Sequence, residues 1–397
     1  MLKLEVRLKQ HTPLIHFQHD QDGAALRSSE VKPRLDKYLK TATRNNKPIW
    51  TKEEYSKYLI GAGTERETAA FDYKLRISAS GNPRHFIIAS YLKSTEAAEA
   101  NAKRPDATIM SGAPYFAQEK EYKDRKWNEL SKEGILYPEG MTLTFTCRNQ
   151  EMLDRIASII CLFFAKYNFG TRQSKGFGCF SVSGITASYP IDEAYKKVPC
   201  NSNEYEALLK ESFSFIYKYD ERFPKDTQKL FSAINTWYKT LKSGDSAKKK
   251  NSALMLYFDR KGITWEKNFI KKEFFHDNKT KVQDAKFVRA LLGLTDAYDF
   301  KNHGTKVNVE HKAADKNNKI ERYGSPVTVK VHDGCFYFAG NEVEEGIKGQ
   351  KFNFTAKGKT YPLATPSEFS LRSFMQSAMS QKTFKNKDGK SKFLQIK

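Results

Sequence analysis

A short loop of the chain combines flexible backbone, positive charge and an aromatic ring, which together suit a phosphate-bearing ligand. Residues 169–180 read F-G-T-R-Q-S-K-G-F-G-C-F. Glycine lets the backbone take positive φ and approach another chain closely, and bare N–H groups beside cations attract phosphate oxygens. A phenylalanine ring could stack on a base or a ribose. The candidate contacts are Gly170, Arg172, Lys175, Gly176, Phe177 and Gly178.

This loop matches neither of the common nucleotide-binding loops. A Walker A loop follows a strand and ends in G-K-[ST], and the dinucleotide-binding G-x-G-x-x-G opens a helix. Residues 169–180 have neither form. The competing interpretation is a tight structural turn with incidental surface charge, and the charge of the whole chain argues against it.

The chain is strongly basic. Its 397 residues include 68 lysines and arginines against 46 aspartates and glutamates, a net charge of +22. Such a charge concerns partners more than fold, and nucleic acid or an anionic membrane surface are the usual partners. We see no apolar run of membrane-spanning length, no signal peptide and no basic amphipathic helix. We therefore expect a cytoplasmic protein that binds nucleic acid and does not contact a membrane.

A second loop, H-F-Q-H-D-Q-D-G at 16–23, gathers titratable groups that could catalyse a reaction. A metal-free ribonuclease needs a general base for the 2′-hydroxyl and a general acid for the leaving 5′-oxygen. His16 and His19 could be this base and acid, or Asp20 or Asp22 could be the catalytic residue instead. The competing interpretation is a polar loop whose histidines cap strands or contact phosphates. We favour it, and so expect no catalytic site.

No other pattern supports a metal or a nucleotide cofactor, and we expect neither. The five cysteines lie far apart and form no C-x-x-C pair, which disfavours a zinc site of the usual spacing. The motifs G-x-S-x-G and H-E-x-x-H are also missing from the sequence. His332 lies in a predicted hairpin, where a histidine is more often a packed strand residue than a ligand.

Hydrophobic spacing places the glycine-rich loop between a helix and a strand. Apolar and polar residues alternate over residues 2–8, as in a half-buried strand. Apolar residues with helical spacing then indicate a helix that begins at Ser28 or at Pro33. Further expected elements are strands at 71–78 and 84–91 joined by the turn S-G-N-P, a strand at 141–147, a helix capped by Asn149 and a strand at 180–185. This order predicts a ferredoxin-like domain with an insertion near residues 94–133.

The second half predicts a mixed α/β domain. Its expected elements are helices at 202–242 and 367–380, a strand at 254–258 and a hairpin at 327–340 that turns at Asp333-Gly334. We therefore expect an α+β chain with a ferredoxin-like domain over residues 1–186 and a second domain over residues 201–380. The second domain could be a degenerate copy of the first, and residues 381–397 form a basic tail.

The loop G-T-R-Q-S-K-G-F-G resembles the glycine-rich loop of the RAMP superfamily of CRISPR-associated proteins, whose pattern is G-x-[RK]-x-x-[RK]-G-[FY]-G. The stretch L-R-S-S-E-V-K-P-R-L at 26–35 is similar to a second family motif, which opens the first helix. T-P-L at 12–14 fits the family's first strand end, whereas Asp36 stands where the family often has arginine. R-Y-G-S-P-V-T-V-K-V at 322–331 resembles the start of a strand in two-domain members.

This resemblance implies a non-catalytic subunit of a CRISPR ribonucleoprotein, most like the large subunit at the guide 3′ end of type III-B (Cmr) effector complexes. Such a subunit binds guide RNA, helps to capture single-stranded target RNA and contacts other RAMP subunits. The family also offers an alternative, a metal-independent endoribonuclease that processes CRISPR RNA with His16 and His19. Beside the glycine-rich loop, the cations expected to line the RNA groove are Arg27, Lys32, Arg34 and Lys37.

Overall fold

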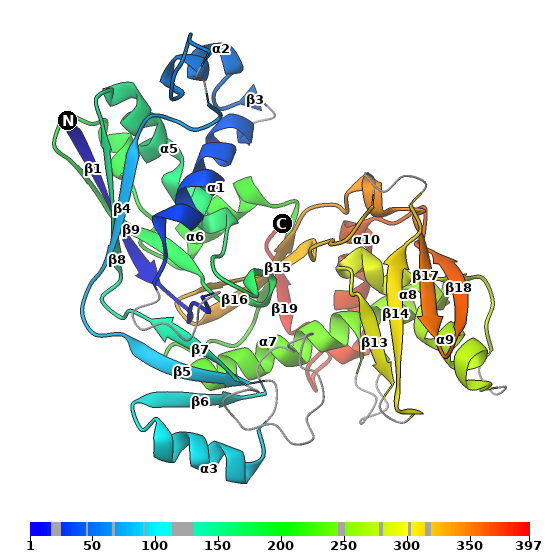
Figure 1. Ribbon diagram of the computed structural model, residues 1–397. Helices are drawn as coiled ribbons and strands as arrows, with labels where there is room; N and C mark the ends of the chain where they lie inside the picture. Colours follow the sequence, from blue (N-terminus) through cyan, green and yellow to red (C-terminus); the bar gives the residue numbers. More distant parts are fainter. Residues whose placement is uncertain are drawn as a thin grey trace.

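Two four-stranded antiparallel sheets with the same strand order form the two main units of the molecule. In the computed structural model, the first sheet lies at the left of Figure 1 and the second near its centre. The structure describes residues 1–16, 25–44, 47–65, 68–89, 92–112, 131–244, 251–277, 281–300, 303–313 and 319–397. Among these residues, no helix has the length and apolar character needed to cross a membrane.

The first unit has six elements in the order strand, helix, strand, strand, helix, strand. They are β1 (Leu2–Gln10), α1 (Ser28–Thr41), β4 (Lys74–Ala79), β8 (Met141–Cys147), α5 (Gln150–Lys166) and β9 (Phe180–Ala187). The strands pair in the order β4-β8-β1-β9, and every pair is antiparallel. This is the ferredoxin-like arrangement, so the predicted fold is confirmed.

The burial pattern explains these layers. Leu4 and Val6 of β1 are fully buried beneath the helices, while the residues that alternate with them lie on the other face of the sheet. The side chain of Asn149 accepts a backbone N–H of the first turn of α5, which confirms the predicted cap. Of the two starts considered for the first helix, the structure has Ser28, so Pro33 lies inside α1.

A separate three-stranded sheet is inserted between β4 and β8. Its elements are β5 (Arg84–Ala89), α3 (Ser94–Lys103), β6 (Ala107–Ser111) and β7 (Ser131–Leu136), with strand order β6-β5-β7. The predicted strands near residues 71–78 and 84–91, joined by S-G-N-P, are confirmed, but β4 and β5 lie in different sheets. Because its last four residues are all buried, β5 takes the centre of its own sheet. The inserted part therefore begins before residue 94.

The second unit repeats the order of the first. Its elements are β10 (Phe215–Tyr219), α7 (Thr227–Lys242), β15 (Val327–His332), β16 (Cys335–Gly340), α10 (Leu371–Ser380) and β19 (Phe393–Gln395). The strands pair in the order β15-β16-β10-β19, again all antiparallel. The second half thus contains another ferredoxin-like unit, and the predicted hairpin turn at Asp333-Gly334 and helix near residues 367–380 are confirmed.

Three expectations for the second half need correction. The region 202–242 is not helical throughout, because the aromatic and β-branched run of β10 forms a strand between α6 (Ser202–Ser212) and α7. Residues 254–258 lie in a helix, α8 (Ala253–Asp259), whose buried face is formed by Ala253, Leu254, Tyr257 and Phe258. Residues 381–397 are not a tail, because β19 completes the second sheet beside β10.

A further sheet extends from the second unit at the right of Figure 1. Its strands, in the order β13-β14-β17-β18, are β13 (Ala297–Phe300), β14 (Thr305–His311), β17 (Lys351–Ala356) and β18 (Lys359–Ala364). The remaining short elements are β2 (Thr43–Arg44), β3 (Lys47–Pro48), α2 (Lys52–Tyr55), β11 (Thr264–Trp265), α9 (Glu266–Phe275) and β12 (Ala285–Lys286).

A buried carboxylate ties α1 to the chain that enters β4. Asp36 is 6% exposed and accepts hydrogen bonds from the Tyr73 hydroxyl at 2.7 Å and from the Phe71 N–H at 3.2 Å. Lys32 donates to the same carboxylate at 2.9 Å and to the Phe71 carbonyl at 2.9 Å. A buried carboxylate is tolerated when its oxygens are satisfied in this way.

We predict that Asp36→Ala destabilises the protein, because it leaves the ammonium of Lys32 and two further donors without their acceptor. The expected loss is about 3 kcal/mol, seen as a fall in Tm of about 6 °C or more. Asp72→Ala is the matched control, since it removes an exposed carboxylate close by. Equal changes in Tm for the two variants would contradict this account.

Candidate nucleic-acid interface

The glycine-rich loop, residues 170–178, joins α5 to β9 and packs against its own unit. Gly170 has φ +75° and Gly178 has φ +62°. A Cβ added at Gly178 would lie 2.0 Å from the carbonyl oxygen of Phe169, and one at Gly170 would lie 2.5 Å from that of Ile15. These glycines therefore allow close approach of the protein's own backbone.

The backbone N–H groups of the loop are also largely engaged within the protein. Gly170 donates to the Glu30 carboxylate at 2.7 Å, and Gly178 donates to the Pro13 carbonyl at 2.9 Å. We expected bare N–H groups that face phosphate oxygens. For these two glycines that expectation is wrong, because each N–H already has a short internal partner.

Phe177 fills the junction between the two units. Its side chain is fully buried and stacks on Phe231 of α7, with ring centroids 4.1 Å apart and an interplanar angle of 17°. The expected role in base stacking is therefore wrong for this structure. Next to it, a Cβ added at Gly176 would lie 3.1 Å from Val329 and 3.4 Å from Ile234, so this glycine lets β15 and α7 approach the loop.

The two cations of the loop have different surroundings. Lys175 is half-buried, and its Nζ lies 2.8 Å from the centroid of the Tyr238 ring on α7. Burial lowers the pKa of Lys175 and raises that of Tyr238 to about 12. Arg172 takes a left-handed conformation with φ +58° and is also half-buried. Lys175 therefore contacts the second unit, whereas Arg172 stays at the bend of the loop.

A buried lysine of β15 caps the helix that precedes the loop. Lys330 is 0% exposed and donates to the carbonyls of Phe164 at 3.1 Å and Tyr167 at 3.0 Å, and to Oδ1 of Asn168 at 2.6 Å. The last carbonyls of a helix lack internal partners and carry partial negative charge, so a cation is favourable there. Burial nevertheless lowers the pKa of Lys330 to about 8.

The amide of Asn168 completes this junction. Its Nδ2 donates to the Val329 carbonyl on β15 at 2.9 Å and to the Gln173 carbonyl in the glycine-rich loop at 2.7 Å. Asn168 is 2% exposed, so these bonds are shielded from water. The buried amide of Asn168 thus connects the glycine-rich loop to β15 of the second unit.

The cations expected on the first helix do not form a single row. Lys32 is bound to Asp36, and Arg34 donates to the Asn168 carbonyl at 2.8 Å and to Gln173 Oε1 at 3.1 Å. These two side chains hold the fold, so their expected place in a groove is corrected. Arg27 is half-buried and Lys37 is exposed, and both remain candidate contacts.

The histidine-rich loop supplies only part of the alternative catalytic site. His16 is 7% exposed, and burial together with the charge of Arg27 lowers its pKa. His19, Asp20 and Asp22 lie outside the described residues. The described part of this loop therefore presents a buried, neutral histidine.

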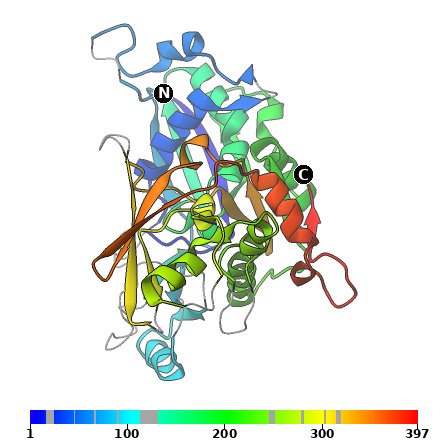
Figure 2. The same cartoon turned by 90° about the vertical axis from the view of Figure 1, so that its right-hand side faces the viewer.

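Sequence analysis missed a second loop that is equivalent in topology. Residues 381–392, here called the lysine loop, join α10 to β19 just as the glycine-rich loop joins α5 to β9. It projects from the body at the right of Figure 2. The Lys392 N–H donates to the Phe384 carbonyl at 2.8 Å, and Phe384 is fully buried. The signal that could have revealed it is the short apolar strand after the lysines.

The lysine loop carries its charge at the surface. Its exposed lysines are Lys382, Lys385, Lys387 and Lys390. None of them forms an ion pair with any carboxylate in the part of the chain that the structure describes. Asp388 is the single acidic residue of the loop. A row of exposed ammonium groups suits phosphates spaced along a strand.

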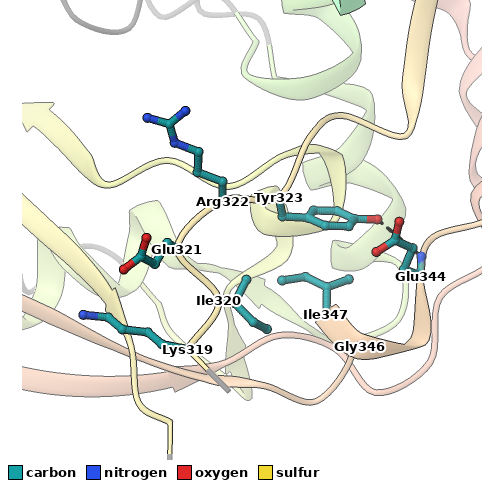
Figure 3. Close-up of a pocket in the computed structure, with 8 residues that line it drawn as sticks. All are labelled: Lys319, Ile320, Glu321, Arg322, Tyr323, Glu344, Gly346 and Ile347. Atoms are coloured by element: carbon teal, nitrogen blue, oxygen red, sulfur yellow. Dashed lines mark hydrogen bonds between the residues drawn. The ribbon is translucent and has the colours of Figure 1, made fainter. Parts of the chain in front are cut away.

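A cleft in the second half has mixed charge and is a weaker candidate. Its lining residues are Lys319, Ile320, Glu321, Arg322, Tyr323, Glu344, Gly346 and Ile347 (Figure 3). The Tyr323 hydroxyl accepts the Glu344 N–H at 3.4 Å, and Arg322 points away from this pair (Figure 3). Two carboxylates offset the two cations, so the cleft has no clear preference for an anion.

We predict that Lys330→Met destabilises the protein, because three buried oxygens at the end of α5 lose their donor. The expected loss is about 3 kcal/mol, or a fall in Tm of about 6 °C. Lys359→Met, at an exposed position of β18, is the control and should leave Tm nearly unchanged. An unaltered Tm for Lys330→Met would show that the cap is dispensable.

The lowered pKa of Lys330 also predicts a pH dependence. Its pKa falls from 10.5 to about 8 in the folded state, so between these values the unfolded chain binds more protons. Stability should therefore rise with pH across this window. The Tm of the wild type minus the Tm of Lys330→Met, measured from pH 7 to pH 10 in matched buffers, isolates the contribution of Lys330 to this pH dependence. We expect the difference to increase above about pH 8, and a constant or falling difference would contradict the assignment.

Comparisons with known proteins identify the family of this chain. A model of the Cmr1 N-terminal domain matches residues 1–245, and a model of the Cmr1 C-terminal domain matches residues 249–396. A search of curated proteins found no match. The crystal structure of apo Cmr1 from Pyrococcus furiosus is similar at 12% identity and a TM-score of 0.40, over 100% of this chain and 99% of that one. A cryo-EM structure of the Type III-B Cmr-beta bound to cognate target RNA is similar at 11% identity and a TM-score of 0.45, over 95% of this chain and 98% of that one.

Since the two family models span nearly the whole sequence, the chain belongs to the Cmr1 family, in agreement with its resemblance to Cmr subunits of the RAMP superfamily.

Proposed function

We propose that this protein is a non-catalytic RNA-binding subunit of a cytoplasmic type III-B Cmr complex. It holds guide RNA near the 3′ end, helps to capture target RNA and contacts other RAMP subunits. Membership of the Cmr1 family supports this role. The net charge of +22 supports a polyanionic partner.

The exposed lysine loop is the observation that carries the proposal. It occupies the topological position of the glycine-rich loop, yet its ammonium groups face solvent, whereas the ammonium of Lys175 in the first loop faces the Tyr238 ring. We propose that it contacts RNA phosphates, with Arg27, Lys37 and Arg172 as further contacts on the first unit. Phosphate contacts fix position without reading sequence, so base preference should be slight.

The burial of His16 supports a role without catalysis. A general base or acid must come within hydrogen-bonding distance of the reacting hydroxyl. At 7% exposed, His16 has little surface to offer an RNA strand. Cleavage of a CRISPR RNA precursor by the purified chain, abolished by His16→Ala, would instead establish the endoribonuclease alternative.

We predict that the triple variant Lys385→Ala, Lys387→Ala, Lys390→Ala weakens binding of single-stranded RNA. Each lost phosphate contact lowers the slope of log affinity against log salt by about 0.7, so three contacts lower it by about 2. Fluorescence anisotropy with a labelled RNA over a salt series measures both affinity and slope.

A matched control separates local contacts from overall charge. The triple variant Lys306→Ala, Lys351→Ala, Lys359→Ala removes the same charge from exposed positions of the sheet β13-β14-β17-β18. We expect it to keep most of the salt slope. If the two triple variants lose equal affinity and salt slope, RNA binding depends on the net charge alone and the lysine loop is not the site.

A further inference from the structure

Two histidines and an aspartate meet where the β15–β16 hairpin contacts the end of β1. His11 follows β1, His332 ends β15, and Asp333 begins the turn of the hairpin. Each offers one ligand atom for a metal ion, and these atoms lie within 4.8 Å of one another. His11 and Asp333 are 322 residues apart in sequence. The cluster is therefore built by the packing of the first unit on the second.

Hydrogen bonds fix the protonation state of His11. The backbone N–H of Asp333 donates to Nδ1 of His11 at 3.2 Å, so Nδ1 carries a lone pair. The proton is then on Nε2, which donates to Oγ of Ser181 on β9 at 2.8 Å. Metal-binding histidines commonly have their second ring nitrogen held by such a partner.

The carboxylate of Asp333 faces the same lone pair. Its Oδ1 lies 3.3 Å from Nδ1 of His11. With the proton of His11 on Nε2, Nδ1 and Oδ1 are both acceptors, and their present partners are the Asp333 N–H and the ammonium of Lys9. A cation bound between the two acceptors would replace both partners. Two ligands about 2.0 Å from a tetrahedral Zn²⁺ also lie about 3.3 Å apart, so this pair already has the spacing of two zinc ligands.

His332, the third member of the cluster, has an unsatisfied ring nitrogen. It is 3% exposed, and its Nδ1 has no hydrogen-bond partner in the described part of the chain. Its ring stacks on Tyr205 at 4.1 Å and 11°, which fixes the plane of the imidazole. A buried polar atom without a partner is unusual unless a water or an ion satisfies it.

Lys9 forms an ion pair with Asp333. Its Nζ lies 2.7 Å from Oδ1 of Asp333, and its side chain is 54% exposed. An exposed ion pair of this kind contributes little free energy. Lys9 can therefore turn to solvent and leave the carboxylate to a metal.

We propose that His11, His332 and Asp333 bind one Zn²⁺, with water as the fourth ligand, and so join the two ferredoxin-like units. Two imidazoles and one carboxylate form a donor set that Zn²⁺ accepts, whereas Mg²⁺ and Ca²⁺ prefer oxygen ligands alone. Sequence spacing could not reveal this site, because its ligands come from opposite ends of the chain. An ion that binds only the folded arrangement stabilises it.

The test uses the full chain without a histidine tag, stripped with a chelator and dialysed against buffered Zn²⁺. We expect one Zn²⁺ per chain by elemental analysis and a higher Tm than in the stripped protein. Co²⁺ in place of Zn²⁺ should give the visible absorption bands of a four-coordinate site with nitrogen and oxygen ligands. A wild-type chain that retains no metal would overturn the proposal without any variant.

Two variants locate the ion. Asp333→Asn keeps the shape of the side chain and tolerates the positive φ of the turn, and we expect it to lower Zn²⁺ affinity at least tenfold. His332→Gln should abolish stoichiometric binding, and Asp72→Asn, at an exposed site, should change neither. Circular dichroism of the stripped proteins shows whether each is folded, and if His332→Gln is not, Asp333→Asn decides. Equal affinity of wild type and Asp333→Asn would overturn the assignment.

Discussion

The ammonium group of Lys330 is the interaction on which the arrangement of the two units depends. A lysine with no exposed surface is unfavourable unless all its protons find acceptors. Here the acceptors are two carbonyls and an amide oxygen at the end of α5, on the other unit. Neither partner is satisfied if the units separate, because the helix end then lacks its cap and the lysine loses its bonds. The contact therefore couples the folding of β15 to that of α5.

This coupling determines what the glycine-rich loop can do. The loop starts directly after the capped helix end, so β15 and α7 cover one side of it, and Phe177 is inserted between the units. Its glycines serve close backbone approach, and its lysine contacts Tyr238. In the lysine loop of the second unit, no described segment covers the exposed lysines. The same fold is thus present twice. In the first copy the loop before the last strand is buried against the other unit, and in the second copy the equivalent loop presents its lysines to solvent.

Local patterns predicted the elements but not their partners. The alternation in residues 2–8, the apolar spacing after Asn149 and the Asp333-Gly334 turn each depend on near neighbours, and each was confirmed. Sequence could not show that Phe177 is buried by α7 or that residues 393–395 complete the second sheet, because these contacts join distant segments. The family motif correctly identified the superfamily. It could not show which cations of the motif are satisfied inside the protein, as Arg34 and Lys32 are.

Hydrogen–deuterium exchange of the whole chain, with and without single-stranded RNA, tests this division of labour most directly. The amides of Gly170 and Gly178 donate to internal acceptors, so these two amides should exchange slowly without RNA and change little when RNA is added. The lysine loop, residues 381–392, should exchange faster and become protected by RNA. Protection of residues 170–178 by RNA, with residues 381–392 unaffected, would contradict the account.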